Sequence, residues 1–159
     1  RSYNAATARL SELMGMQPVQ VEAAELSQAL ATGVVASMIS SGSTGYDKKV
    51  WEELTHFYDV NAWLPRNYIF VNKDAWDGLD KSTQSIVKGM AMLAEQSGTA
   101  RAQQLSDWYI SQLAANGMTV QAAKGQLLTD LQEIGKTMTS EWQKAAGDTA
   151  TAIISNFQK

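Results

Sequence analysis

Residues 62–80 read AWLPRNYIFVNKDAWDGLD, and the order of residues in this stretch indicates how the chain is organised. Its aromatic and β-branched residues predict an extended segment, which is long for a single strand. Pro65 favours an edge or crossing position, because proline cannot donate a hydrogen bond to a sheet ladder. We therefore expect a crossing or hinge strand over 61–80, between an α/β lobe over 1–60 and a helical part over 81–159.

The chain after this segment is expected to be mainly helical. From about 82 to 116 the sequence favours one long helix, whose apolar positions fall into two groups, 86–93 and 105–113. At 1.5 Å per residue such a helix measures about 50 Å, and its divided apolar stripe indicates contact with two bodies. The run 117–121 predicts a strand, and the amphipathic helix after it is interrupted at Gly147.

The chain before the crossing segment alternates between strand and helix signals. Asn4 is a good N-cap for a first helix, and Gly15 is placed to end it in the left-handed conformation. The run VQV (19–21) is extended, and a second helix stops at Gly33. VVASMIS (34–40) is apolar and β-branched, which predicts a strand buried on both faces. This spacing predicts parallel βαβ units with right-handed crossovers.

Size and composition are those of an ordinary globular protein. The chain has 159 residues, of which 45% are hydrophobic, and a net charge of -3. A nucleic-acid partner is not expected, because binding a phosphate backbone needs a basic surface. The absence of cysteine excludes disulfides and thiol catalysis and fits either redox compartment. No apolar run in the sequence approaches the roughly 20 residues that cross a bilayer.

Few residues could support enzymatic chemistry. His56 is the only histidine and has no second histidine at metal-ligand spacing. SSGSTG (40–45) matches neither the serine-nucleophile motif nor a phosphate loop. It is either a plain loop that caps a helix or the oxyanion or phosphate site of a small hydrolase-like enzyme. Trp108 and Trp142 fall on helix stripes and are expected in the core, whereas Trp63 fits a core or a pocket equally well.

Taken together, the order of these segments resembles a known family. The order is Arg1, NAAT (4–7), Gly15, ALATGVV (29–35), the small-residue loop, and then 62–80 with a long helix after it. It is similar to that of the solute-binding proteins of tripartite ATP-independent periplasmic (TRAP) transporters, in their C-terminal half. The resemblance covers nearly the whole chain. It implies a type II periplasmic-binding-protein-like α/β lobe, an N-terminal lobe outside this chain, a signal peptide removed upstream of Arg1, and a periplasmic location.

The resemblance also implies which residues bind the ligand. Arg1 corresponds to an arginine that forms a bidentate salt bridge with the substrate carboxylate. A planar, permanently charged guanidinium suits this task, because it donates two parallel hydrogen bonds where lysine offers a point charge. Ser40 and Ser41 present hydroxyls where relatives present an amide or an indole, and Trp63 and Asn67 complete the set of expected substrate-binding residues.

The ligand expected from the resemblance is a carboxylate-bearing organic acid. Ile39 occupies a position where a carboxylate could help to hold a metal ion, so neither a metal nor another cofactor is expected. Ala23 and Trp63 suggest room for an apolar or aromatic body. The two lobes would close about the crossing segment and the long helix, and the closed form would dock on a TRAP permease in the membrane. The alternative remains a small α/β enzyme that uses the loop 40–45.

Overall fold

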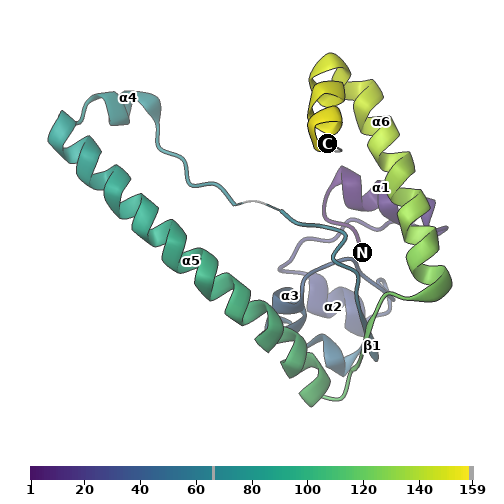
Figure 1. Cartoon of the computed structure of the whole chain (residues 1–159). Helices are drawn as coiled ribbons and strands as arrows, with labels where there is room; N and C mark the ends of the chain where they lie inside the picture. Colours follow the sequence, from purple (N-terminus) through teal and green to yellow (C-terminus); the bar gives the residue numbers. More distant parts are fainter. Residues whose placement is uncertain (66, 158–159) are drawn as a thin grey trace.

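A computed structural model describes residues 1–65 and 67–157 of the chain. Residue 66 of the predicted crossing segment and residues 158 and 159 of the predicted C-terminal helices lie outside the described residues. The elements are α1 (Ala5–Leu13), α2 (Leu26–Ala31), α3 (Gly42–Asp47), the 3-10 turn η1 (Val50–Glu52), β1 (His56–Asp59), α4 (Lys73–Asp77), α5 (Lys81–Ala115), β2 (Thr119–Ala122) and α6 (Gly125–Phe157). Figure 1 shows a small body around α1, α2 and α3, from which α5 and α6 diverge.

Helix α1 begins and ends at the residues that the sequence predicts. Asn4 Oδ1 accepts a hydrogen bond from the backbone N–H of Thr7 at 2.8 Å, and the Thr7 hydroxyl accepts one from the Asn4 N–H at 3.2 Å. This reciprocal capping box satisfies two N–H groups that the helix cannot pair internally. Gly15 has a φ of 74°, and the N–H of Met16 reaches back to the Ser11 carbonyl at 2.9 Å. These contacts belong to a Schellman motif, in which glycine is favoured.

The sheet is parallel, as predicted. Strand β1 pairs with β2 in a register that places His56 opposite Thr119, and the connection between them runs through α4 and α5. An isolated parallel bridge joins Ser2 to Gln20 across α1. The strand predicted at 117–121 is therefore confirmed, with its bounds at Thr119–Ala122.

The run 34–40 is not a strand, and this prediction was wrong. Val35 is buried, but Val34 is 59% exposed, so the run is not covered on both faces. Among the described residues, one hydrogen bond connects this run to residues 1–3, from the amino nitrogen of Arg1 to the Ser37 carbonyl at 2.5 Å. Residues 1–3 are followed at once by α1, which begins at Ala5, so within the described chain they are too short to pair with the run 34–40 as a strand.

The hydrophobic core is small and lies where α2, η1 and the C-terminal end of α5 meet. Its fully buried side chains include Leu26, Val50 and Leu113. The placement of two tryptophans in the core was wrong, because Trp108 is 42% exposed and Trp142 is 44% exposed. Trp108 contacts the ring of Tyr46 of α3, with centroids 4.9 Å apart, but lies at the edge of this contact and keeps much of its surface exposed.

Helix α5 confirms the predicted long helix. Its 35 residues correspond to about 52 Å, and Asp80 caps it by accepting from the N–H of Thr83 at 2.9 Å. Leu113 near its end is fully buried against α3, where Gly45 allows a close approach. The first half of the helix instead exposes its apolar positions: Ile86, Val87, Met90, Met92 and Leu93. The two predicted apolar groups therefore differ in burial.

The segment between β1 and α4 is extended, as predicted, but its described residues form no sheet ladder. Six large apolar side chains on it are exposed: Trp63, Leu64, Tyr68, Ile69, Phe70 and Val71. The prediction of a strand over 61–80 was therefore wrong: the described residues up to 72 form an extended connection outside any sheet, and Lys73–Asp77 form helix α4. Asn72 ends the segment by capping α4, where its Oδ1 accepts from the N–H of Ala75 at 3.0 Å.

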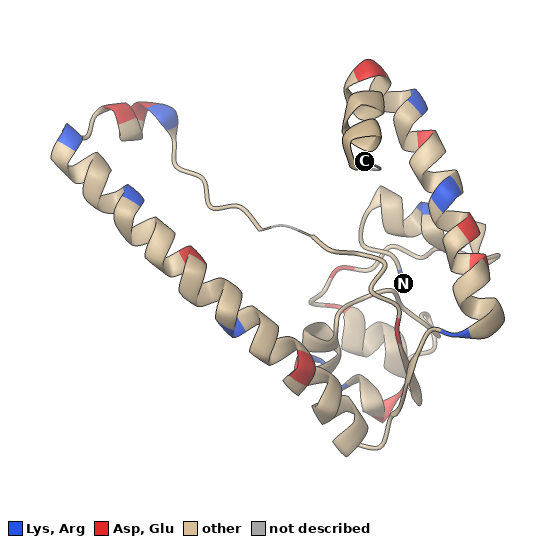
Figure 2. Cartoon of the chain, viewed as in Figure 1, with Lys and Arg blue, Asp and Glu red and all other residues tan. Residues whose placement is uncertain are grey.

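Helix α6 breaks at the predicted glycine. Gly147 has φ 65° and ψ -144°, and the chain turns back beyond it (Figure 1). Charged residues of both signs are distributed along α5 and α6 (Figure 2). Among the helices described, none is both long enough and apolar enough to span a membrane.

Candidate ligand site

Arg1 is held by contacts from three segments of the chain. Its amino nitrogen donates to the Ser37 carbonyl at 2.5 Å, and its Nε donates to the Val21 carbonyl at 2.9 Å. Its Cζ lies over the ring of Tyr3, 5.1 Å from the ring centroid. The residue is half-buried. Arg1 is therefore fixed along its length between the runs 19–21 and 34–40.

The outer end of the Arg1 guanidinium keeps its binding capacity. No described residue accepts a hydrogen bond from Nη1 or Nη2, and the ion pairs of the described chain involve Arg9, Lys73 and Lys136 instead. Two parallel N–H donors on a partly desolvated cation match a planar carboxylate. The arrangement can hold an anion without any change in the backbone.

Ser41 is used locally to start α3. Its Oγ accepts from the N–H of Thr44 at 3.2 Å and lies 2.9 Å from the Oγ of Ser43. The interpretation of 40–45 as a capped helix start is therefore favoured over an oxyanion site. Ser40, one residue earlier, is half-buried, and its hydroxyl has no hydrogen-bond partner among residues 1–65 and 67–157.

Trp63 and Asn67 lie on the extended segment and not around Arg1. Trp63 is 38% exposed, and Asn67 is exposed. Within the described part of the chain, no hydrogen bond or ring contact joins either residue to Arg1. Of the five predicted substrate-binding residues, Arg1 is thus the one whose side chain is both held in place and left with free hydrogen-bond donors in the described chain.

Two residues that hold the Arg1 side chain, Tyr3 and Val21, were not predicted from the sequence. Tyr3 is two residues from Arg1, and on an extended segment this spacing places both side chains on one side. That signal was available. Val21 acts through its backbone carbonyl, which has no side-chain signature in any sequence.

His56 has local partners that explain it without a catalytic role. Its Nδ1 lies 2.8 Å from the hydroxyl oxygen of Thr55, and its ring stacks on Tyr58 with centroids 6.2 Å apart. Across the described residues, no group of three or more histidine or acidic side chains is arranged to hold a metal ion.

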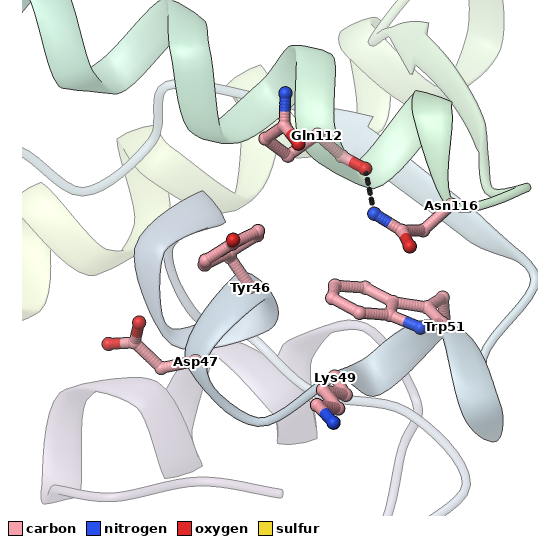
Figure 3. A pocket seen from close by; sticks show the side chains of 6 residues that line it. All are labelled: Tyr46, Asp47, Lys49, Trp51, Gln112 and Asn116. Carbon is pink, nitrogen blue, oxygen red and sulfur yellow. Dashed lines mark hydrogen bonds between the residues drawn. The ribbon is translucent and has the colours of Figure 1, made fainter.

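A hollow lies away from Arg1, between α3, η1 and the end of α5 (Figure 3). It is lined by Tyr46, Asp47, Lys49, Trp51, Gln112 and Asn116. The Asn116 side-chain amide already donates to the Gln112 carbonyl at 2.8 Å, and the ring of Tyr46 lies 5.9 Å from that of Trp51. Since this hollow is open and part of its polar lining is paired, Arg1 is the stronger candidate for ligand binding.

Comparison with known proteins decides the family. The sequence profile described as bacterial extracellular solute-binding protein, family 7, matches residues 2–147. The chain belongs to this family. The predicted family is thereby confirmed, and a comparison with curated proteins finds no match.

Three solved structures are closely similar to this chain. One is a marine metagenome TRAP solute-binding protein from an unidentified microbe, specific for pyroglutamate, with 49% identity and a TM-score of 0.92. The alignment covers 99% of this chain and 52% of that protein. Two Bordetella pertussis extracytoplasmic solute receptors that bind pyroglutamic acid follow. The first is 46% identical to this chain, with a TM-score of 0.94, and the alignment covers 99% of this chain and 52% of the receptor. The second is 34% identical, with a TM-score of 0.93, and the alignment covers 100% of this chain and 53% of the receptor.

These similarities confirm the predicted fold class. The three structures superpose on nearly the whole of this chain, so its parallel strands and long helices are those of a TRAP solute-binding protein. The chain spans about half the length of each of these relatives, at 52% to 53%.

Proposed function

We propose that the protein containing this chain captures a carboxylate-bearing organic acid in the periplasm and delivers it to a TRAP-type membrane permease. Membership of family 7 supports the general activity. The observation that supports the ligand class is the state of Arg1, whose Nε is fixed by the Val21 carbonyl while Nη1 and Nη2 have no partner in the described chain. A half-buried cation in this state favours an anion as its partner.

The proposed ligand is pyroglutamate or a close cyclic relative. Three proteins with 34% to 49% identity to this chain bind it. Pyroglutamate carries one carboxylate on a small lactam ring, so its charge matches the single guanidinium of Arg1. In this proposal Ser40 and Asn67 form hydrogen bonds with the polar groups of the lactam ring, and Trp63 packs against the apolar face of the ring. Ser41 contributes by fixing the start of α3.

A second lobe is proposed to complete the site. The extended segment and the first half of α5 both expose large apolar side chains, such as Ile69, Phe70 and Met90. Large apolar side chains exposed in such number are typical of a region that contacts another body. The relatives are about twice as long as this chain. We propose that the second lobe covers these residues and closes on the ligand about the segment 61–80 and α5.

The enzymatic alternative is not favoured, and we infer that the protein is not an enzyme. The Ser41 hydroxyl is engaged in capping α3, and the ring of His56 pairs with Thr55. A serine nucleophile needs a base within hydrogen-bond reach, and neither residue has the other as a hydrogen-bond partner in the described chain. Capture and release of a solute need no covalent step.

The test is a thermal-shift titration of the protein at the full length of its relatives with a panel of organic acids, including L-pyroglutamate, succinate and phenylacetate. Ligand binding raises the melting temperature as ligand concentration rises above Kd. We expect the largest increase with L-pyroglutamate, and unchanged ligand when the mixture is analysed by mass spectrometry. Formation of a product, or no stabilisation by any carboxylate in the panel, would contradict the proposal.

A further inference from the structure

The structure restricts how Arg1 can bind an anion. A guanidinium offers two bidentate edges to a carboxylate, one through Nε and one Nη, and one through both Nη atoms. The first edge is occupied, because Nε donates to the Val21 carbonyl at 2.9 Å. The edge that remains free for a carboxylate is the one at the end of the side chain, formed by Nη1 and Nη2.

One face of the same guanidinium is also covered. Arg1 Cζ lies over the Tyr3 ring, 5.1 Å from its centroid, within the range of a cation–π contact. The ring therefore limits rotation of the guanidinium plane about the side chain. It also prevents a flat solute from stacking on that face.

We infer that Tyr3 is a positioning residue that holds the guanidinium of Arg1 for end-on capture of a carboxylate. This inference rests on the proposed function and adds how the site selects its ligand. With its plane fixed by Tyr3 and by the Val21 carbonyl, the Arg1 guanidinium selects a planar anion approaching from its end. A neutral analogue gains little from this arrangement, since it lacks the charge-assisted pair of hydrogen bonds.

The experiment compares Tyr3→Leu, which keeps an apolar side chain but removes the π face, with Tyr3→Phe, which keeps the ring. Affinities for L-pyroglutamate and for its neutral amide, L-pyroglutamide, are measured by calorimetry on the protein at the full length of its relatives. We expect Tyr3→Leu to weaken L-pyroglutamate binding by roughly fivefold and to leave L-pyroglutamide within about twofold of wild type. Tyr3→Phe is expected to restore carboxylate affinity.

A matched control and a structural readout complete the test. Tyr58→Leu makes the same change at a ring that stacks on His56 and is expected to leave both affinities unchanged. A crystal structure of unliganded Tyr3→Leu is expected to show Nε of Arg1 displaced from the Val21 carbonyl. Retention of that hydrogen bond, or an equal loss of affinity for both ligands, would overturn the inference.

The two levels of the proposal fail in different ways. If Tyr3→Leu binds L-pyroglutamate like wild type while Arg1→Ala does not, the role of Tyr3 is wrong and the proposed function stands. If Arg1→Ala also binds like wild type, the proposed use of Arg1 is wrong and the role of Tyr3 is overturned with it.

Discussion

Arg9 and Glu141 form a two-point ion pair that joins α1 to α6 across 132 positions of the sequence. Arg9 Nη2 lies 2.6 Å from Glu141 Oε1, and Arg9 Nε lies 3.0 Å from Glu141 Oε2. Arg9 also contacts Glu12 within α1 at 3.1 Å. This ion pair therefore links the start of the chain to its last helix at the surface of the molecule.

The first prediction concerns this pair and pH. The hydrogen bond from Arg9 lowers the pKa of Glu141 below the ordinary value of 4.5. A carboxylate with a depressed pKa in the folded state stabilises it above the unfolded pKa and loses that effect as pH falls through the folded value. We expect Glu141→Gln to increase amide hydrogen exchange in α6 at pH 7, with the difference from wild type shrinking as pH falls below 4.5 and disappearing below the lowered pKa of Glu141 in the folded state.

The control for this prediction is Glu133→Gln, which breaks an exposed pair with Lys136 inside α6. It is expected to have little effect, because this pair makes one contact between neighbouring turns of the same helix and does not join α6 to another element. Equal exchange in wild type and Glu141→Gln at pH 7 would show that the pair does not hold α6.

The second prediction concerns the contact between α3 and α5. A Cβ added at Gly45 would lie 3.3 Å from Leu113 Cδ2 and 3.4 Å from Val50 Cγ2, both of them buried side chains. We expect Gly45→Ala to destabilise the fold by about 1–2 kcal/mol in chemical unfolding, because the packed side chains of Leu113 and Val50 would have to shift to admit the extra methyl group. Gly98→Ala is the control. Gly98 lies inside α5, and a Cβ added there would have no neighbouring atom within 4 Å. Gly98→Ala is therefore expected to stabilise the fold by about 0.5–1 kcal/mol.

The third prediction concerns the end of α3. Lys49 adopts φ 48° and ψ 46°, the left-handed conformation that costs a non-glycine residue roughly 1 kcal/mol. We expect Lys49→Gly to raise stability by about 0.5–1 kcal/mol in thermal unfolding. Lys48→Gly serves as the comparison, because Lys48 has a negative φ of -98° and gains nothing from glycine. A loss of stability in Lys49→Gly would contradict the assignment of strain.

Local signals made much of the fold predictable. Asn4, Gly15 and Gly147 mark helix boundaries through their own backbone preferences, and the structure has a boundary or break at each of them. The prediction of a strand over 34–40 was wrong because a strand needs a neighbouring strand to pair with, as well as residues that favour an extended backbone. The placement of Trp108 in the core was wrong for a related reason: an apolar stripe predicts the face of a helix that makes contacts, but not how completely the contacting element, here Tyr46 of α3, covers each side chain.

The candidate site was predictable in part. Arg1 could be proposed through the resemblance, and its geometry supports that proposal. Residue type alone could not show that Ser41 is engaged in capping α3. The Val21 carbonyl could not be found either, because any residue at that position carries one. Tyr3 was accessible through its spacing from Arg1.

The most direct measurement is the affinity of L-pyroglutamate for Arg1→Ala and Arg1→Lys in the protein at the full length of its relatives, determined by calorimetry at pH 7. Arg9→Ala is the matched control, because it removes an arginine that already pairs with Glu141. Loss of two charge-assisted hydrogen bonds is expected to weaken binding by about 100-fold or more in Arg1→Ala, with Arg1→Lys restoring only part of it. Arg9→Ala should bind like wild type. An Arg1→Ala variant that is folded and binds L-pyroglutamate with wild-type affinity would contradict the account.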